Sequence, residues 1–166
     1  MLYTTLCTKD EPERHSPSAL YQTSGEPVIF VVDDDFRIRH LIGTLLRRLT
    51  PAAVTEAADP HAALLMARNI GGPIDLLISD IDLRASINGV DLARALARAN
   101  PSMNVLLISA VERPPSWIPE TWRFLAKPFT LESFLASIGP LCWPAIEGLG
   151  NLGAHGLVRS LALERS

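Results

Sequence analysis

Short apolar runs that alternate with helical patterns constrain the fold of this chain more than any other feature. The run VIFVV at Val28–Val32 is continuous, β-branched and aromatic, which is typical of a strand buried on both faces of a parallel sheet. Comparable runs recur along the chain, and the weakest lies at Ala53–Ala57. The predicted strands are Val28–Val32, Ala53–Ala57, Ile74–Ser79, Asn104–Ser109 and Trp122–Ala126.

Helical patterns lie between these runs. Apolar side chains recur every three to four residues over Phe36–Leu49, and Asp35 directly before them is expected to cap that helix. The remaining helices are predicted over 60–69 behind an Asp-Pro start, over 90–99, and from Thr130 to a stop at Gly139. Strict alternation predicts an α/β fold with a parallel sheet, right-handed crossovers and helices on both faces.

The connection from the fourth to the fifth strand breaks this pattern. It spans Ala110–Thr121 and contains Pro114, Pro115 and Pro119. Because each proline inside a helix costs about 3 kcal/mol or more, we expect a degenerate fourth crossover without a regular helix.

The length, the composition and the net charge limit the classes of protein to which this chain can belong. The 166 residues, 48% of them apolar, suit one domain with its own core. A net charge of -3 gives no reason to expect nucleic acid as a partner. No apolar run approaches the roughly 20 residues of a membrane span, and the start of the sequence has no secretory pattern, so we expect a cytoplasmic protein.

Composition also predicts the domain boundaries. Residues 1–26 are polar and are expected to form a flexible tail, residues 27–140 the folded domain, and residues 141–166 a C-terminal extension without an effector domain. The two cysteines lack CxxC spacing and indicate neither a disulfide framework nor a zinc site.

Chemistry-bearing residues gather where the predicted strands end. Asp33 and Asp34 follow the first strand, Asp80 follows the third, and Ser109 and Lys127 stand at the ends of the fourth and fifth. Ligands of open parallel sheets bind outside the carboxyl ends of the strands, so these groups are expected to converge. Clustered carboxylates repel one another unless a cation neutralises them, and oxygen-only ligands suit Mg²⁺.

These parts suit phosphoryl transfer to a carboxylate. Asp can accept a phosphoryl group covalently, while a metal, an ammonium and a hydroxyl neutralise its oxygens. The chain has 13 Arg but only two Lys, Lys9 and Lys127, so a lysine at a strand end stands out. A compact ammonium acts as a point charge on a phosphate oxygen, which the planar arginine fork does not.

Four short motifs follow one another along the chain: VVDDD, ISD, ISA and KPF. The separations are 46 residues from Asp34 to Asp80, 29 from Asp80 to Ser109 and 18 from Ser109 to Lys127. Together these motifs resemble the receiver domain of two-component response regulators. The resemblance implies a flavodoxin-like, doubly wound five-stranded sheet of order 2-1-3-4-5. It implies a phosphoacceptor that takes phosphoryl from a sensor histidine kinase or a histidine phosphotransfer protein, assists its own phosphorylation and dephosphorylation, and is otherwise not an enzyme. Output then passes through contacts with a downstream protein that the sequence does not name.

The resemblance also assigns roles. Asp80 corresponds to the phosphoacceptor and also to a metal ligand, and Asp34 corresponds to a direct Mg²⁺ ligand. Asp33 would act largely through water, and the backbone carbonyl of Asp82 would be a third ligand. Ser109 corresponds to the switch hydroxyl and Phe124 to the aromatic switch residue, while Lys127 is expected to precede Pro128 through a cis peptide bond. The chain departs from the family pattern at Arg84, where members often have proline.

Two other functions fit parts of the pattern. The segment DID at 80–82 resembles the nucleophile motif of haloacid dehalogenase-type phosphohydrolases, but the order of motifs along the chain argues against that family. A receiver-like scaffold that binds a partner without phosphorylation is the other alternative, and the irregular crossover keeps it open.

Overall fold

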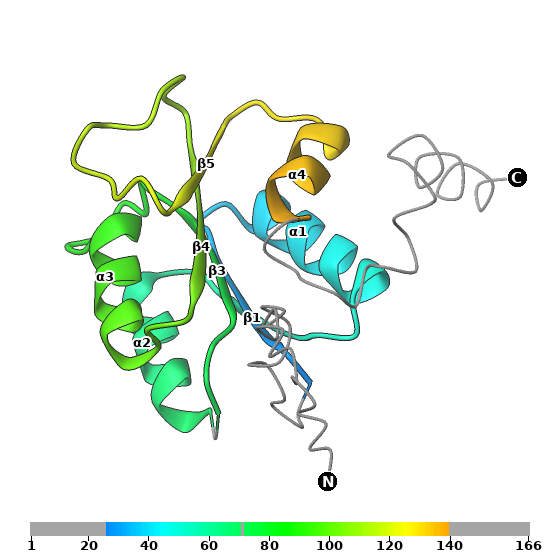
Figure 1. Ribbon diagram of the computed structural model, residues 1–166, viewed down its shortest axis with the longest axis vertical. Helices are drawn as coiled ribbons and strands as arrows, with labels where there is room; N and C mark the ends of the chain where they lie inside the picture. The colour runs from blue at the N-terminus through cyan, green and yellow to red at the C-terminus, as the bar shows by residue number, and fades with distance from the viewer. Residues whose placement is uncertain (1–25, 71, 140–166) are drawn as a thin grey trace, which may run out of the picture.

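Five parallel strands form the centre of the fold, in the order β2-β1-β3-β4-β5 (Figure 1). The computed structural model describes residues 26–70 and 72–139. The flavodoxin-like fold and its strand order are confirmed, and β3 starts two residues later than predicted and includes Asp80. The strands are β1 (Val28–Val32), β2 (Ala53–Ala57), β3 (Leu76–Asp80), β4 (Asn104–Ser109) and β5 (Arg123–Ala126).

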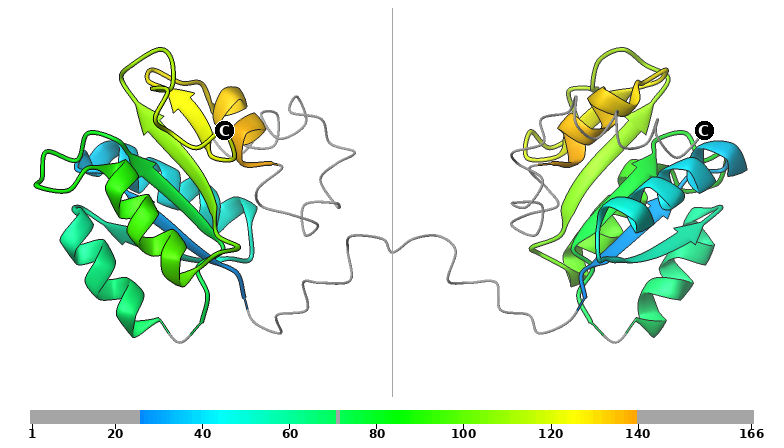
Figure 2. Two further views of the ribbon diagram at one scale, coloured as in Figure 1. Left: turned by 60° about the vertical axis from the view of Figure 1, so that its left-hand side comes forward. Right: turned by 90° about the vertical axis from the view of Figure 1, so that its right-hand side faces the viewer.

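Helices cover both faces of this sheet. The second and third lie together on one face and the first and fourth on the other, as two views of the ribbon show (Figures 1 and 2). Their bounds agree with the predictions to within one residue. The helices are α1 (Phe36–Leu49), α2 (Pro60–Asn69), α3 (Gly89–Ala99) and α4 (Leu131–Ile138).

The two faces of the sheet carry separate apolar cores, because successive strand residues point to opposite sides. In β1, Phe30 and Val32 pack with α2 and α3, whereas Ile29 and Val31 pack with α1 and α4. Both sets are buried. The unbroken apolar run of β1 is therefore the direct consequence of a strand covered on both faces.

Polar caps set where the helices begin. The Asp35 side chain accepts a hydrogen bond from the Arg37 amide at 2.8 Å, which confirms its predicted capping role at α1. Helix α3 starts one residue earlier than predicted because the Asn88 side chain accepts from the Asp91 amide. These caps satisfy free amides in the first turns of α1 and α3 and so fix where the two helices begin.

The connection from β4 to β5 contains no helix, as predicted. The segment consists of bends and turns. In one turn, the Ile118 amide donates a hydrogen bond to the Pro115 carbonyl at 3.0 Å. Ile118 is buried in the core on the α3 side, and Arg94 of α3 donates to the Trp117 carbonyl at 3.0 Å. An apolar anchor and a side-chain hydrogen bond thus hold this helix-free segment on the α3 side of the sheet.

The predicted flanking segments fall outside the described residues, apart from Glu26 at the end of the first. Their assignment, 1–26 as a tail and 141–166 as an extension, stays a prediction. Within residues 26–70 and 72–139, no helix combines the length and the apolar character that crossing a bilayer requires.

Candidate functional site

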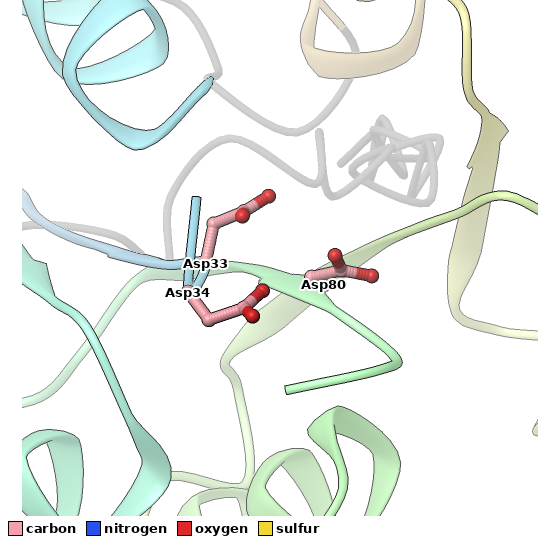
Figure 3. Close-up of side chains that lie close together, drawn as sticks. All are labelled: Asp33, Asp34 and Asp80. Carbon is pink, nitrogen blue, oxygen red and sulfur yellow. The ribbon is translucent and has the colours of Figure 1, made fainter. Parts of the chain in front are cut away.

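Three carboxylates from two neighbouring strands meet at the carboxyl edge of the sheet. Asp33 and Asp34 directly follow β1, and Asp80 is the last residue of β3. One oxygen from each lies within 4.8 Å of the others. Figure 3 shows the Asp33 and Asp34 side chains leaving the end of β1 in different directions.

Parallel pairing explains why these residues meet. Val32 of β1 is level with Ser79 of β3, and Asp80 is level with Ile108 of β4. Ser109 is level with Ala126 of β5. The residues that follow each strand therefore emerge along one edge, which brings together positions up to 94 residues apart in the sequence.

Asp33 is the most enclosed of the three acids, with 2% of its surface exposed. Its carboxylate accepts hydrogen bonds from the Asp35 amide at 2.8 Å and from Lys127 Nζ at 2.9 Å. Burial raises the pKa of Asp33, and this effect outweighs the two hydrogen bonds and the nearby Lys127 charge, which act in the opposite direction. The site thus contains a carboxylate that is costly to ionise without further positive charge.

Lys127 joins two of the acids. Its Nζ lies 2.6 Å from Asp80 Oδ2 and 2.9 Å from Asp33 Oδ2. Burial by itself lowers the pKa of Lys127, but hydrogen bonds and charge from Asp80 and Asp33 outweigh it, so its pKa is raised. The Lys127–Pro128 peptide bond is cis. Lys127 therefore presents a permanent positive charge beside Asp80 at neutral pH.

Ser109 completes the edge at the end of β4. The residue is buried, its Oγ accepts from the Val111 amide at 3.3 Å, and its carbonyl accepts from the Lys127 amide at 2.6 Å. That last bond ties the backbone of the lysine to the backbone of the serine. Phe124 is partly buried and packs against the core on the α3 side.

Asp82 differs from the other predicted residues. Its side chain is exposed, and the carboxylate does not belong to the acidic group found among the described residues. Its amide donates to Asp80 Oδ1 at 3.1 Å, which orients the Asp80 carboxylate. The predicted role of Asp82 concerns its carbonyl and stays a prediction.

Two residues at the site make close contacts that the sequence analysis did not assign to them. Gly89 lies against β3 so closely that a Cβ there would fall 1.8 Å from the Asp80 carbonyl oxygen. Arg84 pairs with Asp34 through Nε at 3.3 Å from Oδ2. A glycine nine residues after Asp80 was a visible signal for the first, whereas no spacing rule predicts which acid Arg84 reaches.

The donor set fits a hard divalent cation. All three acidic side chains offer oxygen, the ligand atom that Mg²⁺ prefers, and Mg²⁺ commonly keeps several waters while one or two carboxylates bind it. Lys127 compensates two of the carboxylates and Arg84 the third, and two cations facing three acids leave net negative charge. This balance attracts further positive charge into the pocket.

Comparison with known proteins identifies the family. The sequence model for the response regulator receiver domain matches residues 29–139. The chain belongs to the response regulator receiver domain family. It is thus a receiver domain of two-component signalling, and its acidic pocket lies where Asp33, Asp34 and Asp80 meet.

Individual relatives agree with this assignment. The sensor kinase CckA of Brucella abortus (strain 2308) is 26% identical over 119 residues, which are 69% of this chain and 12% of that kinase. The chain therefore spans about an eighth of the length of this curated relative. The solved receiver domain of the hybrid histidine kinase CckA is 29% identical, with a TM-score of 0.59 over 70% of this chain and 99% of that structure.

A more distant structure shows the fold alone. The response regulator receiver protein from Sinorhizobium medicae WSM419 is 24% identical, with a TM-score of 0.62 over 72% of this chain and 97% of that structure. Receiver domains are signalling modules, and this fold supplies the sheet edge on which the acidic pocket is built.

Proposed function

We propose that this receiver domain accepts a phosphoryl group on Asp80 in a Mg²⁺-dependent reaction. The observation that carries the proposal is the arrangement around Asp80, whose Oδ2 lies 2.6 Å from Lys127 Nζ beside a second and a third carboxylate. The donor class is a phosphohistidine of a sensor kinase or of a phosphotransfer protein, as relatedness to the receiver domain of a hybrid histidine kinase supports.

In the proposed reaction, an Asp80 carboxylate oxygen attacks phosphorus. An O–P bond forms as the N–P bond to the donor imidazole breaks, and the leaving nitrogen takes up a proton. The Asp82 amide holds Asp80 Oδ1 at 3.1 Å, so the carboxylate is oriented before the donor arrives. Positioning of this kind is a large part of what catalysed phosphoryl transfer requires.

The metal would be held by Asp34 and Asp80 directly, by Asp33 largely through water, and by the Asp82 carbonyl. When bound there, Mg²⁺ supplies neutralisation of the charge that builds up on the phosphoryl oxygens. Lys127 offers its ammonium to another of those oxygens once Asp80 is modified, and the Ser109 hydroxyl offers a hydrogen bond. A change in the partners of Ser109, felt at Phe124 and the neighbouring loop, would carry the signal to a downstream protein in the cytoplasm.

Intact-protein mass spectrometry after incubation with acetyl phosphate or phosphoramidate tests the proposal. Wild type should gain one phosphoryl group with Mg²⁺ and none with chelator, and Asp80→Asn should gain none. Asp91→Asn is the matched control, because it removes an exposed carboxylate from the first turn of α3. Labelling that persists in Asp80→Asn, or that ignores Mg²⁺, would overturn the assignment.

A receiver-like scaffold that binds its partner without phosphate is the second candidate. The observation that favours it is the helix-free connection from β4 to β5, since this segment follows Ser109 directly. Absence of labelling in wild type, with an intact fold and bound Mg²⁺, would favour the scaffold. The phosphohydrolase alternative is not proposed, since the chain belongs to the receiver family.

A further inference from the structure

Arg84 lies in the loop between β3 and α3, and its side chain turns back toward the acidic pocket. Its Nε is 3.3 Å from Asp34 Oδ2, whereas the Arg84 side chain is otherwise 84% exposed and that of Asp34 is 26% exposed. The contact therefore places a second cation at the open side of the pocket, in addition to Lys127 at the enclosed side.

The two cations divide the carboxylates between them. Lys127 contacts Asp33 and Asp80, and Arg84 contacts Asp34. This division follows from the directions of the side chains, because Asp33 and Asp34 leave the end of β1 differently (Figure 3). Among the predicted metal ligands, Asp34 is thus the one whose charge a loop arginine already compensates.

The backbone of the loop holds Arg84 in an unusual conformation. Its φ of 46° lies in the left-handed region, which non-glycine residues adopt rarely and asparagine more readily than most. The loop is held on both sides of this residue. The Gly89 amide donates to the Ile81 carbonyl at 2.9 Å, and Ser86 Oγ lies 3.3 Å from His61 Nε2 of α2.

We propose that Arg84 is a tethered counter-ion that competes with Mg²⁺ for Asp34 and so lowers the affinity of the site for the metal. A cation entering the pocket takes over the Asp34 carboxylate, and the arginine returns to solvent, which its exposure permits at little cost. The inference rests on the proposed function for its metal site. It makes Arg84 a residue that positions and compensates Asp34, with no part in bond making.

Magnesium binding to the unphosphorylated protein tests this inference by isothermal titration calorimetry with MgCl₂ as the probe. Exposed ion pairs contribute little, so we expect Arg84→Asn to bind Mg²⁺ about two- to fivefold more tightly than wild type at low salt. Asparagine tolerates the left-handed backbone and removes the charge. Arg84→Lys keeps the charge and should stay close to wild type.

A control variant separates this effect from a general loss of positive charge. Arg98→Asn removes an exposed arginine from the last turn of α3 and should leave the affinity unchanged. Raising the salt concentration should shrink the difference between wild type and Arg84→Asn, because salt screens exposed charges. In ¹⁵N spectra, the Arg84 Nε–H signal should move during the titration toward that of a solvated arginine.

Failure of the counter-ion role and failure of the metal site would give different results. Equal affinities of wild type and Arg84→Asn, or weaker binding by Arg84→Asn, would overturn the counter-ion role and leave the proposed phosphoacceptor function intact. Failure of wild type and of every variant to bind Mg²⁺ would instead overturn the metal site, and the counter-ion role with it. Tighter binding by Arg84→Asn and by Arg98→Asn alike would also contradict the proposal, because the effect would then reflect overall charge.

Discussion

Lys127 Nζ lies 2.6 Å from Asp80 Oδ2, although 47 residues separate them in the sequence and β4 lies between their strands. The Lys127 side chain is 18% exposed and that of Asp80 is 10% exposed, so the pair is largely shielded from water. This contact places the cation of the site against its proposed nucleophile and gives both residues a structural role beside the chemical roles proposed for them.

Removing that cation should destabilise the metal-free protein. In Lys127→Met, Asp33 and Asp80 would face each other without their shared partner. Loss of one partner from a fully buried pair costs about 3–5 kcal/mol, and the partial exposure here places the expected loss at about 2–3 kcal/mol. Urea unfolding in chelator measures it.

Magnesium and a charge-preserving variant provide the controls for this prediction. Mg²⁺ should restore more stability to Lys127→Met than to wild type, because a cation then fills the role of the ammonium. Lys127→Arg should retain most of the stability. Equal urea midpoints for wild type and Lys127→Met would contradict the prediction.

The Ser109 hydroxyl should affect the reaction more than the fold. A hydrogen bond to a charged group is worth about 1.5–3 kcal/mol, so Ser109→Ala should slow labelling by acetyl phosphate by roughly tenfold or more. Ser109→Thr keeps the hydroxyl and should label at nearly the wild-type rate. The measurement is the initial rate by intact mass, and equal rates for all three proteins would remove Ser109 from the proposed mechanism.

Asp33 should make stability depend on pH. Burial raises the pKa of Asp33 in the folded protein above its ordinary value of 3.8. At a pH between these two values, the folded protein binds a proton that the unfolded chain has released. The free energy of unfolding should therefore fall as pH rises through this interval. At higher pH, Asp33 should make no further contribution to the change. Urea midpoints measured in chelator should show this slope in wild type and lose it in Asp33→Asn. A slope of the same size in both proteins would assign it to other groups.

Gly89 should tolerate no side chain. A Cβ would fall 1.8 Å from the Asp80 carbonyl oxygen, and backbone cannot move aside cheaply. Overpacking an interior costs roughly 1–3 kcal/mol and sometimes more, so we expect Gly89→Ala at or above the top of that range. Gly43→Ala is the comparison, since its Cβ would meet Glu56 Oε1, the end of a flexible side chain, at 2.2 Å.

Thermal unfolding of Gly89→Ala and Gly43→Ala measures the difference between the two positions. Alanine also favours a helix interior by about 1 kcal/mol over glycine, which offsets part of the clash at Gly43 in α1. Gly89→Ala should therefore melt well below Gly43→Ala. If the two variants melt together, the close approach of α3 to Asp80 is not the reason for glycine at position 89.

The features that could be predicted from the sequence alone are those that depend on local chemistry. The apolar runs placed β1 and β4 at their observed bounds, because a strand covered on both faces is apolar along most of its length. The weaker pattern over Ala53–Ala57 also predicted the observed bounds of β2, which contains Thr55 and Glu56 and lies at an edge of the sheet. The Asp35 cap followed from its position before an apolar stripe. The resemblance of the strand-end motifs to receiver domains indicated the strand order and the residues that meet at the sheet edge.

Tertiary structure decided the contacts that depend on direction and distance. Asp33 and Asp34 are adjacent and chemically identical, yet one is buried against Lys127 and the other faces Arg84 at the open side. The absence of proline at position 84 was visible in the sequence, whereas the partner of its arginine was not. Which acid a long side chain reaches depends on the backbone of a loop and on the packing of α3 against β3, and neither leaves a periodic pattern in the sequence.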